Sequence, residues 1–272
     1  MPSLPHLPSL RTAGRSRTSR PGRTVALITG ASSGLGAEMA RQLAAREHDL
    51  ALCARRTDRL AELAAQLRAA HPGVRVAVRA LDVTQEEQVR EVFQDLAAEL
   101  GRLDRVVVNA GLGKGAPVGT GRADANRQTA TTNVLGALAQ CEAAMEIFRA
   151  QGHGHLVVIS SMSAMRGMAG AATVYAASKA AVASLAEGIR AEMLGHPELD
   201  IRVSTIYPGY IRSEMNASLK GMPFLVDTEV GVRAIVEAIL AERAEARVPP
   251  WPWRPLGTAL RHLPLGVVRR IS

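Results

Sequence analysis

The chain has 272 residues, of which 47% are hydrophobic and 3% aromatic, so its core must be filled mainly by Ala, Leu, Val and Ile. Its net charge of +8 sits in the two ends: residues 1–23 hold five arginines, residues 248–272 hold four, and neither end holds an acidic residue. Charge in two tails is not the basic face of a nucleic-acid-binding domain, and no apolar run approaches the ~20 residues of a membrane span. These properties argue against a nucleic-acid partner and against a membrane-spanning protein.

Residues 1–22 are rich in Pro, Ser, Arg and Gly without periodicity, which predicts a disordered basic leader. An Arg- and Ser-rich, acid-free leader also resembles an organelle transit peptide, although Pro2, Pro5 and Pro8 interrupt any amphipathic helix. The sequence does not say whether the leader is retained. Cys53 and Cys141 lie in apolar runs and indicate a reduced, cytoplasmic protein without a disulfide framework.

From Thr24 onward, short apolar runs alternate with helical patterns. We expect strands within residues 24–30, 49–55, 74–83, 104–111, 154–160 and 201–209. We expect helices over residues 35–47, 58–70, 85–100, 123–150 and 228–243, and one more that carries Tyr175. Apolar runs without polar alternation are typical of strands buried on both faces, and their alternation with helices indicates right-handed βαβ units. The predicted fold class is therefore α/β, with one domain over residues 23–248 that holds a doubly wound, mostly parallel, Rossmann-like sheet and helices on both faces.

The first strand is followed by the turn "TGASSGLG", in which Gly30, Gly34 and Gly36 have the spacing T-G-x3-G-x-G. Glycines at such a turn let the backbone approach a pyrophosphate, which then lies on the positive end of the following helix. We expect a dinucleotide site here, although a glycine cluster can also be a plain strand-to-helix turn. The candidate contacts are Gly30, Ser32, Ser33, Gly34, Leu35 and Gly36.

The end of the second strand reads "CARRTDR", with Arg55 and Arg56 where a nicotinamide dinucleotide would place its adenine ribose. An acidic residue there binds a free 2′-hydroxyl, whereas arginine accommodates a 2′-phosphate. The pattern favours NADP(H) over NAD(H). Two surface arginines are the alternative, and the nearby Asp58 weakens the distinction.

A later helix reads "YAASK", which sets Tyr175 and Lys179 four residues apart. Side chains at i and i+4 lie on one helix face, so the phenol and the ammonium can reach a common ligand. A cation near a phenol favours the phenolate and brings its pKa toward a range useful for proton transfer.

Taken together, "TGASSGLG", "NAG" at 109–111, "VVISS" at 157–161, "YAASK" at 175–179 and "PG" at 208–209 resemble the short-chain dehydrogenase/reductase family in its compact single-domain form. The resemblance runs from about Thr24 to Val248. It implies that Tyr175 donates or accepts a proton and that Lys179 binds the nicotinamide ribose and lowers the pKa of Tyr175. It also implies a homodimer or homotetramer packed through the helices that bear Asn133 and Tyr175.

The same resemblance assigns further roles by position. Ser161 is similar to the serine that hydrogen-bonds the substrate carbonyl, and Asn133 to the asparagine that holds a water in a proton relay. The remaining cofactor contacts that it implies are Asp82 and Val83 beside the adenine, the turn of Asn109, Ala110 and Gly111, and Pro208, Gly209 and Ser213 near the carboxamide. Alternatives stay open: Asn133 can cap or kink a helix, Asp82 can be a turn residue and Ser213 can be solvated.

Two departures from the family pattern bear on these assignments. Val108 stands where the family has the first of two asparagines, and 14 residues rather than the usual 13 separate Ser161 from Tyr175. The longer spacing leaves Ser160 and Ser163 as competitors of Ser161.

The segment from Tyr210 to Asp227 follows the sixth strand, where a loop can close over a ligand. Apolar side chains that indicate a pocket for a lipophilic ketone, aldehyde or secondary alcohol, or simply core packing, are Met162, Met165, Met168, Tyr210, Met215, Leu219, Met222, Phe224 and Leu225.

The tail, residues 249–272, mixes Trp251 and Trp253 with Leu, Val and Arg. Such a segment can lie on a membrane surface as a peripheral contact, or fold over the substrate pocket or a subunit interface. Pro252, Pro255 and Pro264 predict that any helix in it is limited to about two turns.

The sequence therefore predicts an NADP(H)-dependent oxidoreductase without a metal, which interconverts a small-molecule carbonyl and an alcohol. A non-catalytic NADP(H)-binding sensor or scaffold on the same fold is the alternative. Substrate identity, physiological direction and oligomer size do not follow from the sequence.

Overall fold

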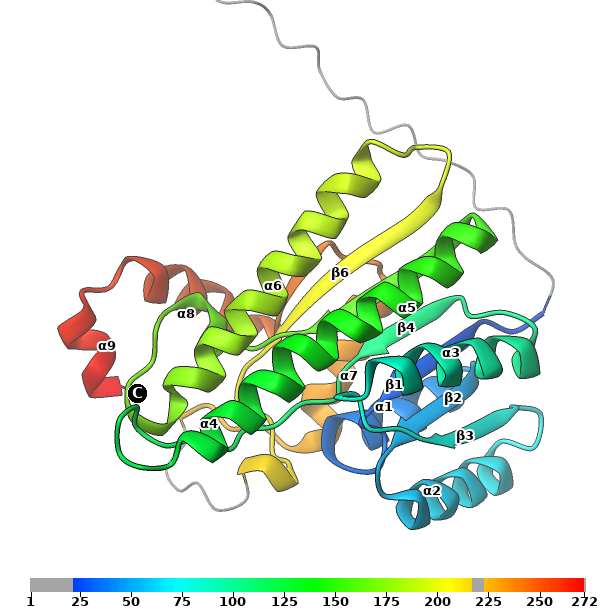
Figure 1. Cartoon of the computed structure of the whole chain (residues 1–272), viewed down its shortest axis with the longest axis horizontal. Helices are drawn as coiled ribbons and strands as arrows, with labels where there is room; N and C mark the ends of the chain where they lie inside the picture. The colour runs from blue at the N-terminus through cyan, green and yellow to red at the C-terminus, as the bar shows by residue number, and fades with distance from the viewer. Residues whose placement is uncertain (1–21, 217–222, 272) are drawn as a thin grey trace, which may run out of the picture.

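The structure, a computed structural model, describes residues 22–216 and 223–271, so nearly all of the predicted leader lies outside the described residues. A seven-stranded parallel sheet in the order β3-β2-β1-β4-β5-β6-β7 forms its centre, with helices on both faces (Figure 1). The strands are β1 (Val25–Thr29), β2 (Asp49–Ala54), β3 (Val76–Ala80), β4 (Arg105–Val108), β5 (His153–Ile159), β6 (Asp200–Pro208) and β7 (Glu245–Val248).

The α-helices are α1 (Gly34–Ala44), α2 (Thr57–Ala70), α3 (Glu86–Leu100), α4 (Ala123–Ala130), α5 (Gly136–Gln151), α6 (Thr173–Leu194), α7 (Thr228–Leu240), α8 (Pro250–His262) and α9 (Leu265–Ile271). Shorter helical segments are the π-helical η1 (Thr131–Leu135) and the 3₁₀ turns η2 (Met162–Met165), η3 (Gly170–Ala172) and η4 (Glu214–Asn216).

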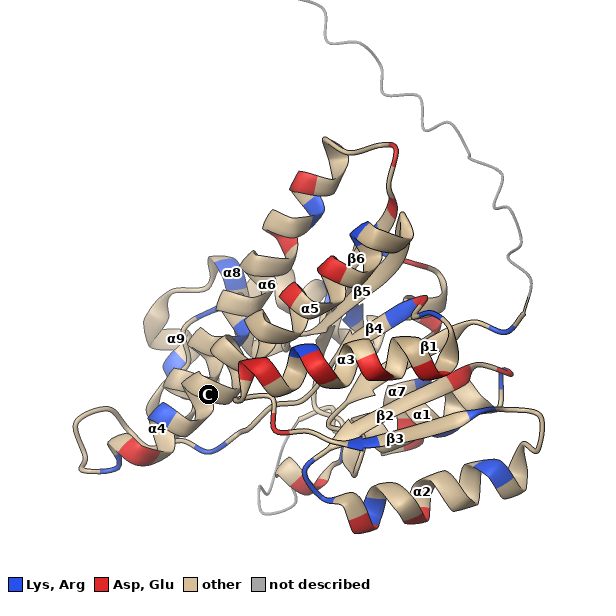
Figure 2. Ribbon diagram, turned by 45° about the vertical axis from the view of Figure 1, so that its right-hand side comes forward, with Lys and Arg blue, Asp and Glu red and all other residues tan. Residues whose placement is uncertain are grey.

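Two apolar layers confirm the doubly wound arrangement. Every residue of β1 and β2 is buried, because helices cover both faces of the sheet. One layer packs the sheet against α3, α5 and α6, and the other packs it against α1, α2 and α7. The charged residues of α3, coloured along its ribbon in Figure 2, are exposed, whereas the large apolar residues of the helix are buried in the first layer. The apolar runs predicted to be buried strands at residues 24–30 and 49–55 are therefore confirmed as β1 and β2.

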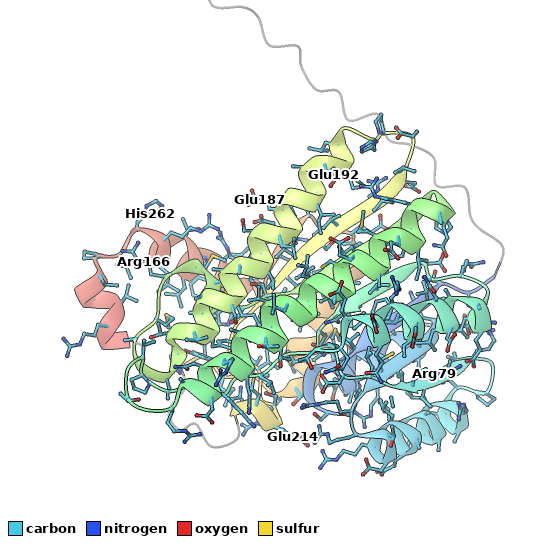
Figure 3. All side chains as sticks on the ribbon, in the orientation of Figure 1. Arg79, Arg166, Glu187, Glu192, Glu214 and His262 are labelled. Atoms are coloured by element: carbon cyan, nitrogen blue, oxygen red, sulfur yellow. The ribbon has the colours of Figure 1, made fainter. Side chains whose placement is uncertain are left out.

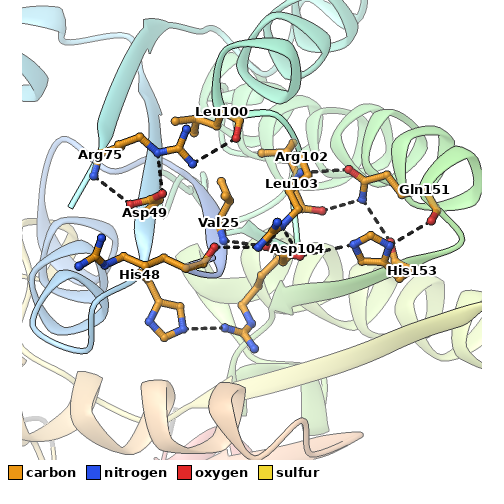
Figure 4. A network of polar contacts seen from close by, with 12 residues as sticks. Val25, His48, Asp49, Arg75, Leu100, Arg102, Leu103, Asp104, Gln151 and His153 are labelled. Carbon is orange, nitrogen blue, oxygen red and sulfur yellow. Dashed lines mark hydrogen bonds and ion pairs between the residues drawn. The ribbon is translucent and has the colours of Figure 1, made fainter. Parts of the chain in front are cut away.

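Polar contacts fix the amino-terminal edge of the sheet (Figure 4). The Asp104 carboxylate accepts hydrogen bonds from the backbone N–H of Val25 at 2.8 Å and from the Arg102 guanidinium at 2.9 Å. The side-chain amide of Gln151 bonds both backbone groups of Leu103, at 3.0 and 2.8 Å. These contacts connect the starts of β1 and β4 to the end of α5. The predicted site residues lie at the opposite, carboxyl-terminal ends of the strands.

Two expectations for the carboxyl-terminal part were wrong. No strand was expected after residue 209, but β7 (Glu245–Val248) pairs with β6 at the sheet edge. Its four residues alternate between exposed and more buried positions, so it has no apolar run to predict it. The tail holds a helix longer than two turns, because α8 is regular from Pro252 onward and Pro255 falls in its first turn, where backbone N–H groups have no helical partner.

The described part of the chain holds no helix of the length and apolar character that crossing a bilayer requires.

Candidate active site

Because all seven strands are parallel, their carboxyl ends meet at one edge, and the predicted residues follow these ends. The glycine turn follows β1, Arg55 and Arg56 follow β2, and the turn of Asn109 to Gly111 follows β4. Ser161 follows β5, Gly209 follows β6, and Tyr175 and Lys179 lie on the first turns of α6.

The turn between β1 and α1 has the backbone that the sequence predicted. Gly30 and Gly34 have positive φ angles of 64° and 54°, which residues other than glycine rarely adopt. A Cβ on Gly36 would lie 2.8 Å from Asn109 Nδ2 and 2.9 Å from the carbonyl carbon of Gly30. These three positions therefore let the turn pass close beneath the start of α1.

The start of α1 suits an anion. Its N-cap residue, Ser33, makes no side-chain capping bond, and the first turn of the helix contains no acidic residue. The first N–H groups and the positive end of the helix dipole are therefore available to a ligand such as a pyrophosphate. The turn and the helix start fit a bound dinucleotide.

Thr29 organises the neighbouring turn, a role that was not predicted from the sequence. Its hydroxyl accepts hydrogen bonds from the backbone N–H groups of Asn109 and Ala110, both at 3.0 Å, and donates to the Gln140 side chain at 2.7 Å. The Asn109 side chain in turn donates to the Thr29 carbonyl at 2.8 Å. A polar residue that ends an apolar strand was the available signal, and its partners lie 80 to 111 residues away.

Tyr175 and Lys179 share one face of α6. The Lys179 ammonium lies 5.9 Å from the centre of the Tyr175 ring and donates to the Ile159 carbonyl at 2.9 Å. Burial lowers the pKa of Lys179 to about 8. Burial also raises the pKa of the half-buried Tyr175, while a hydrogen bond with Ser161 acts in the opposite direction. The lowering of the Tyr175 pKa that the family resemblance implied is therefore not found in the protein alone, where burial dominates.

The three serines after β5 have separate partners. Ser160 is buried and its hydroxyl donates to the Lys179 carbonyl at 2.7 Å. Ser163 donates to Ser161 Oγ from both its hydroxyl, at 3.0 Å, and its backbone N–H, at 3.2 Å. Ser161 is the serine that faces Tyr175, so the geometry favours it over its two competitors as a substrate contact.

Asn133 lies in the π-helical η1, which interrupts the long helical region predicted over residues 123–150. Its side chain accepts from the Leu112 N–H at 2.7 Å and donates to the Leu112 carbonyl at 2.8 Å and to Ser178 Oγ at 3.0 Å. The asparagine thus holds the backbone after Gly111 against α6. Its implied part in a water relay stays a prediction.

The other predicted contacts are at the same edge. Asp82 accepts from the backbone N–H and the hydroxyl of Thr84, at 3.0 and 2.8 Å, as a turn residue does, and Val83 is buried. Pro208 ends β6, and Gly209 leaves room for the Trp253 ring. Ser213 lies over the glycine turn, with its Cβ 3.5 Å from where a Gly34 Cβ would be.

Arg56 lies close to the start of α1. It donates to the hydroxyls of Ser32 and Ser33, at 3.3 and 2.5 Å, and both it and Arg59 contact Glu214. Like these two arginines, Arg55 is exposed. Neither Arg59 nor Glu214 was predicted from the sequence.

An apolar cluster lies beside Ser161. Its buried members are Met162, Met165, Tyr207, Trp253 and Leu260. The Tyr210 and Phe224 rings meet the Trp253 ring edge-on, with centroids 5.4 and 6.3 Å away. Met168 and Leu225 are half-buried, Met215 and Phe224 are exposed, and Leu219 and Met222 lie outside the described residues.

Within residues 22–216 and 223–271, no three His, Cys, Asp or Glu side chains are grouped so that they could hold a metal ion.

The parallel sheet, the glycine turn at the end of β1 and the Tyr–Lys pair of α6 define a Rossmann-like α/β protein of the dinucleotide-binding kind. Comparison with known families agrees, because the model of the short chain dehydrogenase family matches residues 24–223. The chain belongs to the short-chain dehydrogenase/reductase family and is an oxidoreductase of that family.

Individual relatives support the same assignment. An uncharacterised oxidoreductase of Mycobacterium tuberculosis is 51% identical over 246 residues, which cover 90% of this chain and 96% of the relative. A short-chain dehydrogenase from Sphingobium yanoikuyae, solved in complex with NADPH, has a TM-score of 0.75 and 28% identity over 88% of this chain and 94% of its own. A short-chain dehydrogenase/reductase from Burkholderia phymatum, solved in complex with NAD, has a TM-score of 0.78 over 92% and 96% of the two chains, and its 23% identity shows the fold alone.

Proposed function

We propose that this protein is an NADP(H)-dependent oxidoreductase that interconverts a lipophilic ketone or aldehyde and its alcohol, with Tyr175 as the acid/base. The observation that carries the proposal is that Tyr175 lies close to both Lys179 and Ser161, at the end of the sheet where the glycine turn also lies. A nicotinamide dinucleotide bound there supplies the hydride-transfer chemistry.

The residues of the chain supply the binding and the proton. The glycine turn and the start of α1 hold the pyrophosphate. Lys179, which is buried on α6, binds the nicotinamide ribose. Ser161 donates a hydrogen bond to the substrate oxygen and stabilises negative charge that develops on it. Because burial raises the pKa of Tyr175, its phenol keeps its proton at neutral pH and can donate it to a carbonyl oxygen.

The preference for NADP(H) rests on charge at the end of β2. Arg55, Arg56 and Arg59 gather there, and none of the residues between β2 and α2 is acidic. Arginine suits a 2′-phosphate better than a free hydroxyl. The solved relatives include complexes with NADPH and with NAD, so likeness to them does not choose between the two.

The apolar substrate class rests on the cluster beside Ser161. Methionine and aromatic side chains form an adaptable surface there, and Tyr210 and Phe224 extend it along the segment after β6. A relative from Arabidopsis thaliana, 38% identical over 70% of this chain, is named 11-beta-hydroxysteroid dehydrogenase 1A, which agrees with a lipophilic alcohol or ketone.

Other parts of the proposal concern partners and location. A homodimer or homotetramer packed through the helices that bear Asn133 and Tyr175 is supported by Leu135 and Leu138, which are exposed three residues apart where η1 continues into α5. Trp251 and Leu265 in the tail are exposed as well and suit a peripheral membrane contact. The buried, unpaired Cys53 and Cys141 suit a reducing compartment such as the cytoplasm.

Titration with NADPH and NADH by calorimetry, followed by a panel of apolar carbonyls read at the NADPH absorbance band, tests the proposal. We expect tighter binding of NADPH and oxidation of NADPH by some members of the panel. Binding of NADPH without turnover of any carbonyl would instead favour the non-catalytic sensor, and absence of nucleotide binding would contradict the assignment of the glycine turn.

A further inference from the structure

Glu214 connects two distant parts of the site. It lies in η4, the short segment that follows β6, and is labelled in Figure 3. Its Oε2 is 3.1 Å from Arg56 Nη1 and its Oε1 is 2.5 Å from Arg59 Nη1. Each carboxylate oxygen therefore has one guanidinium partner, although Glu214 is separated from Arg56 by 158 residues in sequence.

Arg56 is held in place by more than Glu214. Its Nε and Nη2 donate to the hydroxyls of Ser32 and Ser33, and its Nη1 donates to Glu214. The guanidinium is thus fixed beside the start of α1, with its remaining nitrogen directed to the glutamate. An anion that approaches Arg56 from the side on which Glu214 lies competes with the Glu214 carboxylate for this nitrogen.

The chain before Glu214 passes over the nucleotide turn. The Cβ of Ser213 lies 3.5 Å from where a Gly34 Cβ would be, so the segment crosses above the start of α1 and reaches the end of β2. The glutamate therefore approaches the two arginines from the side on which a dinucleotide would lie.

The glutamate carries a charge at neutral pH. Hydrogen bonds from Arg59 and Arg56, in that order of effect, hold the pKa of the Glu214 carboxyl below its usual range. It thus resembles a phosphate in charge sign and in its use of two oxygens.

We propose that Glu214 occupies the position of the 2′-phosphate between Arg56 and Arg59, competes with that phosphate, and is thereby a specificity-determining residue for NADP(H). The inference rests on the proposed function, since it assumes that the adenine ribose binds at the end of β2. It adds that the affinity for NADP(H) is set by displacement of a residue from the segment after β6, and that Arg59 is part of the phosphate site.

The expected effect is modest, because the side chains of Arg56, Arg59 and Glu214 are 43%, 45% and 55% exposed and water screens their attraction. Two exposed ion pairs correspond to about a three- to tenfold difference in affinity. The effect should shrink as ionic strength rises.

The test uses two nucleotide fragments that differ in the 2′-phosphate, namely 2′,5′-ADP and 5′-AMP, titrated by calorimetry into the full chain. Glu214→Gln keeps the size of the side chain and removes its charge. We expect this variant to bind 2′,5′-ADP about three- to tenfold more tightly at low salt, with 5′-AMP unchanged within about twofold. Glu229→Gln, which removes an exposed glutamate paired with Arg233 at 2.6 Å on α7, is the matched control and should change neither.

A second variant tests the arginine. Arg59→Gln should lower the affinity for 2′,5′-ADP several-fold and leave 5′-AMP unchanged. An equal affinity for 2′,5′-ADP in wild type and Glu214→Gln, or weaker binding in the variant, would overturn the inference.

The outcomes separate this inference from the proposed cofactor. If wild type prefers 2′,5′-ADP and Glu214→Gln does not strengthen the preference, the inference fails while the NADP(H) preference stands. If the preference emerges only in Glu214→Gln, competition by the glutamate is supported and the cofactor proposal for the wild type fails. If neither protein prefers 2′,5′-ADP, both fail.

Discussion

Substitution of Gly36 by alanine should have two opposite effects on the stability of the protein. Gly36 lies in the first turn of α1, where alanine favours a helix by about 1 kcal/mol over glycine. The new Cβ, however, would lie 2.9 Å from the Gly30 carbonyl carbon and 2.8 Å from Asn109 Nδ2, and still nearer to the Gly30 carbonyl oxygen. The Gly30 atoms belong to the backbone and cannot rotate away.

The steric cost should exceed the gain in helix propensity. Insertion of a methyl group into a packed site costs about 1–3 kcal/mol, and here the contact is with the backbone of the turn that α1 packs upon. Because the Gly30 backbone cannot rotate away, the cost should be near the upper end of this range, so Gly36→Ala should lower the free energy of unfolding by about 2 kcal/mol after the propensity gain is subtracted. Relief of the contact must move the start of α1 away from the turn, so NADPH binding should weaken as well.

Urea unfolding and NADPH titration of the same variant provide the assay. Gly188→Ala is the control, because Gly188 also lies within a helix, α6, but a Cβ added there would meet none of the described residues outside that helix within 4 Å. Alanine at this position should therefore stabilise the protein by up to about 1 kcal/mol. If Gly36→Ala were as stable as wild type and bound NADPH equally well, the close approach of α1 to the turn would not be what requires glycine.

Two further predictions concern buried polar groups. Thr29→Val keeps the shape of the side chain but leaves two backbone N–H groups without their acceptor, so the free energy of unfolding measured in urea should fall by about 2–4 kcal/mol. Thr29→Ser keeps the hydroxyl and should lose less than half as much stability. Equal losses in the two variants would show that the hydroxyl is not the acceptor that matters. Burial lowers the pKa of Lys179 from 10.5 to about 8, so between these pH values the unfolded chain holds a proton that the folded chain has lost, and this group makes stability rise with pH by about 3 kcal/mol. Lys179→Met lacks the titration, so the stability of the variant relative to wild type should fall by about that amount between pH 8 and pH 10.5, and a constant difference would contradict a lowered pKa.

Much of the fold could be predicted because its signals are local. The apolar runs before Gly30, Arg55 and Asn109 read as strands covered on both faces, and they are β1, β2 and β4. The spacing of Tyr175 and Lys179 placed both on one helix face without knowledge of their surroundings. Glycine spacing likewise predicted the turn, since positive φ angles at Gly30 and Gly34 are a local backbone property.

What could not be predicted depends on distant contacts. The edge strand β7 exists because it pairs with β6, and the tail helix α8 is anchored by Trp253, whose ring packs on Gly209. The upward shift of the Tyr175 pKa follows from burial of the side chain, which the sequence does not show. The ion pair of Glu214 with Arg56 joins residues 158 positions apart in sequence, and no local sequence pattern around either residue predicts it.

In the proposed reaction Tyr175 exchanges the proton while other residues hold the nucleotide. The most direct measurement is the turnover of Tyr175→Phe with an apolar carbonyl that wild type reduces, together with its NADPH affinity and its unfolding in urea. We predict loss of turnover, an NADPH affinity within a few-fold of wild type, and an intact fold. Full activity in this variant would contradict the assignment of Tyr175 as the acid/base.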